Sequence, residues 1–242
     1  GAKILATGHY ARILSDKSNG SLRLFRGRDR AKDQSYFLYR LNQSQLARTF
    51  FPLGDYLKRE VRQLAAEAGM GGYYRPESQE ICFISARDYR DFLEQHLGSD
   101  LPGPGPVLDL ENRQLGKHKG IHHYTIGQRR GIGIPSSAPY YVVGLEPDSN
   151  TVRVGSKSDL RRKELLVKSV NWIGMSPPSP IFEALVQVRS RHKEAPAVVK
   201  TGEEETVVNF LEPQEAITPG QSAVFYREDE VLGGGIIERV IS

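Results

Sequence analysis

The only cysteine of the chain, Cys82, is the first candidate for chemistry in the sequence. It lies in the stretch EICFI, where the apolar neighbours favour a thiol that is buried for packing. The alternative is a reactive thiol, because cysteine attacks as its thiolate, and nearby cations or a helix N-terminus lower its pKa. Arg75 and Arg87 lie close in sequence, and a helix is predicted just downstream. The residues alone leave both interpretations open.

Two short stretches near the N-terminus contain residue types that contact nucleotides. In ATGHY, Gly8 lets a ligand approach the backbone closely, and His9 can donate a hydrogen bond to a phosphate or a base. In RAKDQS, Lys32 suits a phosphate, while Asp33 and Gln34 suit base edges. The structural alternatives are a tight turn after the strand, a helix N-cap at Asp33 and a solvated lysine. No G-x-x-x-x-G-K-[ST] phosphate loop occurs in the chain.

A basic, glycine-rich stretch covers residues 116–134. Such a backbone is suited to following a phosphate chain, and Tyr124 can stack on a base. His118, His122 and His123 would suit a metal ion, but the stretch contains no carboxylate or thiolate partner, so no metal site is predicted. The alternative is a glycine-rich hairpin without a ligand.

Further cationic residues occur in the C-terminal part of the chain. In VRSRHK, Arg189 and Arg191 alternate, so both are expected to point to one face of a strand. A basic strand face on a barrel is a common surface for docking RNA, although ordinary surface charge is the alternative. Gln221 lies in a second polar stretch of this part, TPGQSAVFY.

Charge is distributed unevenly along the 242 residues, whose net charge is +4. Residues 1–40 contain nine basic and three acidic residues, a net of +6, whereas residues 203–242 contain two and nine, a net of −7. A basic body with an acidic end indicates a polyanionic partner on one face. No apolar run approaches the roughly 20 residues of a membrane span. A single cysteine excludes an internal disulfide and suits a reducing compartment.

Hydrophobic periodicity predicts mixed α/β structure first and strands only afterwards. A buried strand is expected over residues 2–13. Helices are expected within 32–50, 54–70 and 85–97. In the first, Asp33 is the expected N-cap, and Phe37, Leu38 and Leu41 form the apolar face. In the second, Asp55 is the expected N-cap and Gly69 the expected stop. A chain beginning with Gly1 in mid-strand is expected to be a fragment or a processed form.

After the linker LPGPGP, short strands separated by turns predict a small closed barrel or sandwich. HHYTIG, YYVVGLE and TVRVGS are among the expected strands, and GGG at 233–235 is expected to be a bulge or a close packing contact. We therefore predict three domains: an α/β part over 1–98, a central β-rich domain over 99–168 and a C-terminal β-barrel over 169–242.

Six stretches taken together resemble the tRNA-specific 2-thiouridylase family. They are ATGHYAR, KDQSYFLYRL, EICFI, HKGIHHYTIGQRRGIGI, YYVVGLE and TPGQSAVFY…LGGGIIE, and they follow the family's order along essentially the whole chain. The resemblance implies an ATP-pyrophosphatase domain (adenine nucleotide alpha hydrolase-like), a small central β domain and a C-terminal β-barrel. It also implies conversion of the wobble uridine of tRNA to 2-thiouridine. ATP would adenylate the C2 oxygen, and a cysteine persulfide would then attack C2.

The resemblance also implies roles for individual residues. Cys82 would carry the persulfide, and Gly8 would contact ATP, for which Mg²⁺ is expected. The implied tRNA contacts are His9, Lys32, Asp33, Gln34, Arg189, Ser190 and Gln221. Ser190 departs from the family, which usually has an aromatic residue there, so a stacking role at this position is in doubt.

The family's N-terminal part contains an S-G-G-x-D-S loop that grips ATP and a second cysteine that forms a disulfide with the persulfide carrier. Neither feature has a counterpart in these 242 residues. The chain alone is therefore expected to be inactive. The expected partners are tRNA and a sulfur-carrier protein, with no membrane, in the cytoplasm or alternatively an organelle matrix or stroma. The alternative function is a non-catalytic RNA-binding module that has lost the ATP domain.

Overall fold

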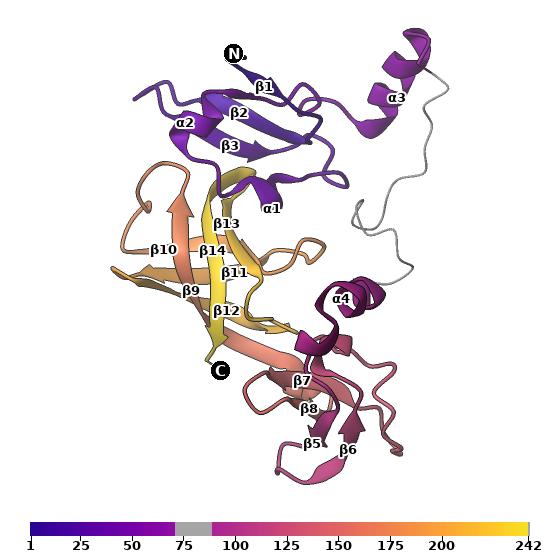
Figure 1. The fold of residues 1–242 in the computed structure, drawn as a ribbon. Coiled ribbons are helices and arrows are strands. Elements are labelled where there is room, and N and C mark those ends of the chain that lie inside the picture. The colour runs from indigo at the N-terminus through magenta and orange to yellow at the C-terminus, as the bar shows by residue number, and fades with distance from the viewer. Residues whose placement is uncertain (71–88, 242) are drawn as a thin grey trace. The chain divides into compact units, whose positions relative to one another are not determined.

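The computed structural model describes residues 1–70 and 89–241, which form two compact units. The first contains the described residues of 1–73, 163–214 and 218–242, and the second those of 74–162 and 215–217. The helices are α1 (Ser35–Leu38), α2 (Gln43–Leu46) and α3 (Lys58–Glu67) in the first unit and α4 (Tyr89–Leu97) in the second, with 3₁₀ turns at Gly98–Asp100, Ile121–His123 and Ser158–Leu160. Figure 1 shows these elements along the chain.

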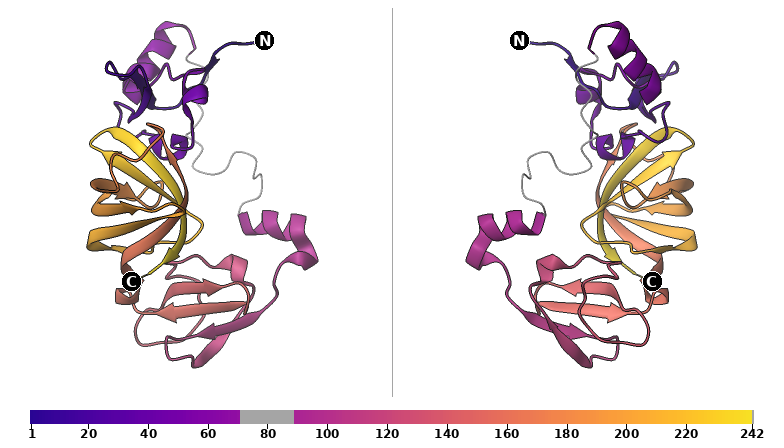
Figure 2. Two further views of the ribbon diagram at one scale, coloured as in Figure 1. Left: turned by 90° about the vertical axis from the view of Figure 1, so that its left-hand side faces the viewer. Right: turned by 90° about the vertical axis from the view of Figure 1, so that its right-hand side faces the viewer.

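Six strands of the first unit close into a barrel (Figures 1 and 2). They are β9 (Arg161–Trp172), β10 (Ile181–Gln187), β11 (Ala195–Thr201), β12 (Glu205–Glu215), β13 (Ser222–Arg227) and β14 (Glu230–Val240). The order is β13-β10-β11-β12-β9-β14, and pairing of β13 with β14 completes the ring. In β12, Thr206, Val208 and Phe210 are buried and their neighbours are not, as the period of two in a strand requires. The predicted C-terminal barrel is confirmed.

The N-terminal hairpin is added to the edge of this barrel. It consists of β2 (Ala11–Ser15) and β3 (Leu22–Arg26), and β3 pairs with the start of β14. Leu24 and Val231 are register partners in this pairing and are both fully buried. A single apolar core therefore joins the hairpin to the barrel, and it fixes the loops that flank β2 and β3.

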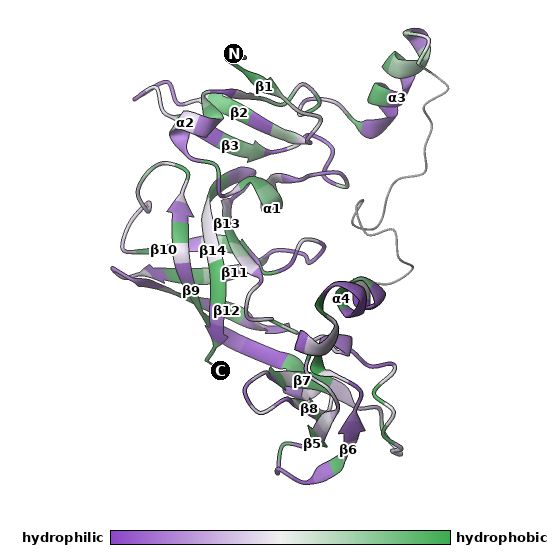
Figure 3. Cartoon of the chain, viewed as in Figure 1, coloured by the Kyte–Doolittle hydropathy of each residue, from purple (hydrophilic) through white to green (hydrophobic). Residues whose placement is uncertain are grey.

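The expectation of a buried strand over residues 2–13 is wrong for the described residues. Two strands occupy this stretch, since β1 (Leu5–Ala6) ends well before β2 begins, and β1 pairs only with β4 (Thr49–Phe50), in parallel. Ile4 and Leu5 are 63% and 66% exposed because one two-residue neighbour cannot cover them. β1 appears green, the apolar colour, in Figure 3.

The helix expected over 32–50 is two separate turns, α1 and α2. Asn42 interrupts the stretch, since its side chain accepts a hydrogen bond from the Gln45 backbone and caps α2. The apolar face also differs from the prediction, because Tyr36 and Tyr39 are buried whereas Phe37 is 62% exposed. Two tyrosines reach polar partners on the barrel through their hydroxyl groups, which a phenylalanine cannot do.

The second predicted helix is confirmed as α3, with two differences. The residue at its N-cap position is Leu57 and not Asp55, and the carboxylate of Glu60 accepts a hydrogen bond from the Leu57 backbone. No described residue of the helix is fully buried, and its apolar stripe is only partly covered, with Val61 half-buried and Leu64 48% exposed. Gly69 follows with a φ of +73°, the left-handed conformation of a helix stop.

The second unit is built on a four-stranded sheet in the order β6-β5-β8-β7. Its strands are β5 (Gly105–Leu108), β6 (Gln114–His118), β7 (Tyr141–Glu146) and β8 (Thr151–Gly155). Val107, Val142, Val152 and Val154 form its core together with Tyr124. HHYTIG, expected as a strand, contains a 3₁₀ turn instead. The chain leaves the strand direction at Gly120, which has a φ of +157°.

Among the residues that the structure describes, no helix is both long enough and apolar enough to cross a bilayer.

Candidate nucleic-acid interface

The loop after β1 presents Gly8 and His9. The backbone of Thr7 donates to the Phe50 carbonyl, and Thr7 Oγ1 lies 2.9 Å from Nδ1 of His9, whose ring lies edge-on to Phe51. Gly8 is exposed, its φ is not in the left-handed region, and a Cβ atom there would meet only Leu53, at an ordinary 3.6 Å. The described neighbours therefore do not require glycine at position 8, and this fits a backbone that a ligand approaches closely.

The loop before α1 lies beside this first loop. The side chain of Gln34 accepts a hydrogen bond from the Tyr10 backbone at 3.1 Å, and the Gln34 backbone donates to the Tyr10 carbonyl at 3.0 Å. This double link holds Lys32, Asp33 and Gln34 next to His9, the residue preceding Tyr10. The structure thus brings together two stretches that are about 25 positions apart in the sequence.

Asp33 is the buried member of this loop, with 7% of its side chain exposed. Its Oδ1 accepts hydrogen bonds from the backbones of Gly27 and Ser35, and its Oδ2 accepts one from Ser35 Oγ at 2.8 Å. The Arg26 guanidinium lies 3.4 Å away. The carboxylate thus organises the turn that precedes α1, but the expectation of Asp33 as the helix N-cap is wrong, because Gln34 occupies that position and its side chain makes no cap hydrogen bond.

Arg26 connects this loop to the barrel. Its guanidinium lies 3.6 Å from the centre of the Tyr226 ring, and its Nη2 lies 3.3 Å from Glu194, in the loop between β10 and β11. Tyr226 is completely buried, and burial raises the pKa of its hydroxyl, which stays protonated beside Ser35 Oγ at 3.2 Å. A buried cation with two acidic neighbours and an aromatic face makes this junction rigid.

Helix α1 carries the contact across to β13. Tyr36 donates to the Ser222 carbonyl at 2.9 Å, and the Tyr39 hydroxyl lies 3.1 Å from Ser222 Oγ. Burial raises the pKa of Tyr36 to about 12, with a further contribution from Tyr39. The Tyr36 hydroxyl is therefore protonated at neutral pH. Since Ser222 directly follows Gln221, α1 places the N-terminal loops next to the C-terminal candidates.

Arg189, Ser190 and Gln221 come together on the turns at one end of the barrel. Arg189 donates to Thr218 Oγ1 at 3.3 Å, and the Gln221 backbone donates to the Thr218 carbonyl at 3.2 Å. Gln187 fixes the turn after β10 by donating to the carbonyls of Arg189 and Ser190, both at 3.0 Å. Ser190 and Gln221 are exposed, and Arg189 is half-buried.

The expectation that Arg189 and Arg191 share a strand face is wrong. Strand β10 ends at Gln187, and both arginines lie in the turn that follows. Alternation of side chains holds only while the backbone is extended, so it gives no common face here.

These contacts link the segments of the first unit that carry eight candidates, and we call this linked set the α1 ridge. It consists of Gly8, His9, Lys32, Asp33, Gln34, Arg189, Ser190 and Gln221, with α1 in the middle. Sequence reasoning did not assign any function to Phe37, which projects from α1 with 62% of its surface exposed and its ring edge-on to Tyr36. A large exposed aromatic between polar contacts is a residue type that stacks on bases.

The glycine-rich stretch of the second unit has a structural core. His118 is buried, and its Nδ1 accepts a hydrogen bond from the Gly120 backbone, so its Nε2 carries the proton and donates to the Asn150 carbonyl at 2.8 Å. Tyr124 is also buried, against His118, so the expectation that its ring is open for stacking is wrong for the described structure. Arg129 and Arg130 are exposed.

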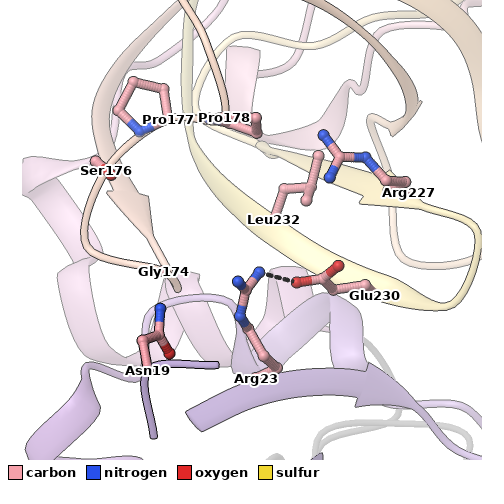
Figure 4. Close-up of a pocket in the computed structure, with 9 residues that line it drawn as sticks. All are labelled: Asn19, Arg23, Gly174, Ser176, Pro177, Pro178, Arg227, Glu230 and Leu232. Carbon is pink, nitrogen blue, oxygen red and sulfur yellow. Dashed lines mark hydrogen bonds and ion pairs between the residues drawn. The ribbon is translucent and has the colours of Figure 1, made fainter. Parts of the chain in front are cut away.

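A polar pocket of about 370 Å³ lies elsewhere on the first unit (Figure 4). Arg227, Pro177 and Pro178 are among its lining residues, together with Arg23, which forms an ion pair with Glu230. No residue of the α1 ridge lines this pocket.

Cys82 lies outside the described residues, which end at 70 and resume at 89.

Three family descriptions match successive parts of the chain. Residues 1–86 match the tRNA methyl transferase HUP domain, residues 90–156 the tRNA methyl transferase PRC-barrel domain, and residues 162–237 the aminomethyltransferase β-barrel domain. The α1 ridge draws its residues from the first and the last of these matches.

Curated relatives match nearly the whole chain. The tRNA-specific 2-thiouridylase MnmA 2 of Syntrophus aciditrophicus is 44% identical over 98% of this chain and 75% of its own length. The tRNA-specific 2-thiouridylase MnmA of Carboxydothermus hydrogenoformans is 46% identical over 99% and 66%, and that of Roseiflexus sp. (strain RS-1) is 48% identical over 99% and 68%. The chain thus spans about two-thirds to three-quarters of the length of these relatives.

Proposed function

Because the chain belongs to the tRNA-specific 2-thiouridylase family, we propose that it takes part in ATP-dependent transfer of persulfide sulfur to C2 of the wobble uridine of tRNA. The α1 ridge is the proposed surface for tRNA. The observation that supports this most is the chain of contacts that links candidates from four separate segments, 8–9, 32–34, 189–190 and 221. The alternative function is a non-catalytic RNA-binding module. The relatives do not favour it, because the three given above are all named tRNA-specific 2-thiouridylase.

The proposed reaction uses Cys82 as the sulfur carrier. ATP supplies the activation of the uracil C2 oxygen as a leaving group, with Mg²⁺ expected on its phosphates. The terminal sulfur of the Cys82 persulfide forms the new bond to C2, and the C2 oxygen leaves with AMP. A second thiol then attacks the remaining bond between the two sulfurs, so that this thiol and Cys82 are oxidised to a disulfide as the thiocarbonyl is released. A sulfur-carrier protein reloads the cysteine after reduction.

Residues of the described chain would bind and orient the substrates. The exposed Gly8 backbone fits a close approach of ATP, since nothing in its described surroundings requires a glycine. His9, Lys32, Ser190 and Gln221 offer polar groups along the ridge, while Asp33 and Gln34 hold the loops in register. In the reaction, these residues act by positioning the tRNA and not by taking up or releasing protons.

Arginine replacement tests the interface. Arg189→Ala should weaken tRNA binding and reduce the slope of log K against log salt by about 1, since one phosphate contact is lost. Lys200→Ala is the matched control, because Lys200 is an exposed cation that pairs with Ile181 at the opposite end of β10. Filter binding between low and moderate salt measures both the tRNA affinity and the salt slope of each variant. Equal salt slopes for the two variants would contradict the assignment of the ridge.

The 242-residue chain contains one cysteine and no S-G-G-x-D-S stretch. We therefore expect no 2-thiouridine when this chain alone is incubated with ATP, a persulfide donor and tRNA, because neither the release thiol nor the phosphate-gripping loop is present among these residues. Mass spectrometry of the tRNA nucleosides measures the product, and its appearance would refute this expectation.

We also propose domain boundaries after residues 98 and 168, and a cytoplasmic location with an organelle matrix or stroma as the alternative. Limited proteolysis tests the boundaries. Residue 168 lies within β9, so the informative strands are the other five of the barrel. Early cleavage within β10–β14, and not near residues 98 and 168, would count against these boundaries.

A further inference from the structure

Three potential metal ligands meet in the second unit, at a place that the proposed function does not use. Glu94 lies on α4, and His122 and His123 lie on the 3₁₀ turn after β6. One donor atom from each lies within 4.8 Å of the other two. We propose that Glu94, His122 and His123 bind one divalent transition-metal ion, with Zn²⁺ as the best match to these ligands.

The distances from Glu94 to the two histidines are close to those of tetrahedral coordination. Metal–ligand distances of about 2.0–2.1 Å place the donor atoms of a tetrahedral zinc site about 3.4 Å apart. Oε1 of Glu94 lies 3.3 Å from Nε2 of His123 and 3.7 Å from Nε2 of His122. The donor atoms of all three side chains lie within 4.8 Å of one another, so small side-chain adjustments bring them to the separations that one ion requires.

Donor chemistry selects the class of ion. Two imidazole nitrogens and one carboxylate oxygen form a set that binds Zn²⁺, whereas Mg²⁺ and Ca²⁺ prefer oxygen ligands alone.

The turn presents its histidines from a fixed backbone. The His123 backbone donates to the Gly120 carbonyl at 3.1 Å, and the Gly120 backbone donates to His118, which is itself buried. The side chain of His122 is 12% exposed and that of His123 is 26% exposed, whereas Glu94 is 51% exposed. Two preorganised ligands thus lie at the edge of solvent, and the third reaches them from α4, leaving a fourth position for water.

The consequence of metal binding is a link between α4 and the sheet domain. Phe92 and Leu93 form the half-buried face of α4, and Glu94 beside them is exposed. Coordination of Glu94 by an ion on the histidine turn adds a cross-link that exists only when the ion is bound. The ion therefore stabilises the folded unit by mass action.

Calorimetric titration of the 242-residue chain with ZnCl₂ tests the proposal. Cys82→Ser serves as the parent protein, because a thiol is itself a zinc ligand. We expect one Zn²⁺ per chain in this parent, and at least about tenfold weaker binding in Glu94→Gln and in His123→Ala. His96→Ala is the matched control and should bind as the parent does, since His96 lies on the same helix with its Nδ1 2.8 Å from the Phe92 carbonyl.

Two results would overturn the assignment. One is a parent that shows no stoichiometric Zn²⁺ binding at neutral pH, which would mean that the three residues form ion pairs only. The other is unchanged affinity in Glu94→Gln. Far-ultraviolet circular dichroism verifies that each variant is folded. If His123→Ala is not folded, Co²⁺ titration of the parent still decides, because tetrahedral Co²⁺ absorbs strongly in the visible.

Discussion

Phe37 occupies the middle of the α1 ridge, between the N-terminal loops and the barrel turns. We expect Phe37→Ala to reduce the free energy of tRNA binding by about 1–3 kcal/mol, the usual value for losing one aromatic stacking partner. Because Phe37 is 62% exposed, the substitution should leave folding almost unchanged. Fluorescence anisotropy with labelled tRNA measures the change.

Ile181→Ala is the control for Phe37→Ala. Ile181 is similarly exposed, at 61%, but it lies at the start of β10, the end opposite to the ridge. Its tRNA affinity should equal that of the unmodified chain. An equal loss of tRNA affinity in both variants would show that Phe37 has no specific role in tRNA binding.

Asp33 combines a predicted tRNA contact with an evident structural role. Asp33→Ala should lower the free energy of unfolding by about 3 kcal/mol, because the buried Arg26 loses a partner and the Gly27 and Ser35 backbones lose their acceptor. Asp55→Ala is the control, since its carboxylate is 81% exposed and lies 4.0 Å from Arg12. Urea unfolding of both variants compares them. Equal midpoints would show that Asp33 does not organise the loop.

At the scale of elements, β14 depends on the three glycines at 233–235. The sequence predicted a bulge or a close contact there, and both are confirmed. The pairing with β9 shifts register between Gly234 and Ile236, and a Cβ atom at Gly233 would lie 2.4 Å from the Asn171 carbonyl oxygen. The backbone of β9 occupies the space where a side chain would be.

Gly233→Ala should therefore destabilise the barrel by about 1–3 kcal/mol, the usual cost of overpacking. Gly174→Ala is the control, because a Cβ atom there meets nothing within 4 Å and its φ is not in the left-handed region. Thermal unfolding followed by circular dichroism measures the difference. A melting temperature for Gly233→Ala no lower than that of Gly174→Ala would contradict the packing argument.

At the scale of the whole molecule, two buried tyrosines make stability sensitive to alkaline pH. Burial raises the pKa of Tyr36 to about 12 and raises that of Tyr226 as well. A tyrosine whose pKa is raised by folding contributes stability below its unfolded pKa of about 10, and this contribution is lost as pH rises through the folded value. The free energy of unfolding should thus decline between about pH 10 and pH 12.

Tyr36→Phe should make this decline shallower, since one of the two titrating groups is removed. Tyr56→Phe, at a tyrosine that is 40% exposed, serves as the control and should follow the unmodified chain. Urea unfolding at successive pH values provides the curves. A decline of the same slope in all three proteins would rule out Tyr36 as its source.

Local signals determined much of this protein from the sequence alone. The alternation in β12, the stop at Gly69 and the glycines of β14 each act through neighbouring residues, so a single chain reveals them. The family resemblance depends likewise on short ordered stretches, and relatives over nearly the whole chain confirm it. Candidates such as Gly8 and Gln221 were named from these stretches, although their juxtaposition was not visible.

Tertiary structure decided which of those residues meet. The two loops lie together because Gln34 pairs with Tyr10, and they reach Gln221 because Tyr36 and Tyr39 bond to Ser222. Glu94 likewise supplies the carboxylate that the histidine stretch lacks in sequence. Periodicity reports which face of an element is apolar, but not which distant partner covers it or which exposed side chain lies beside it. Those contacts depend on packing across the whole chain, which no local pattern encodes.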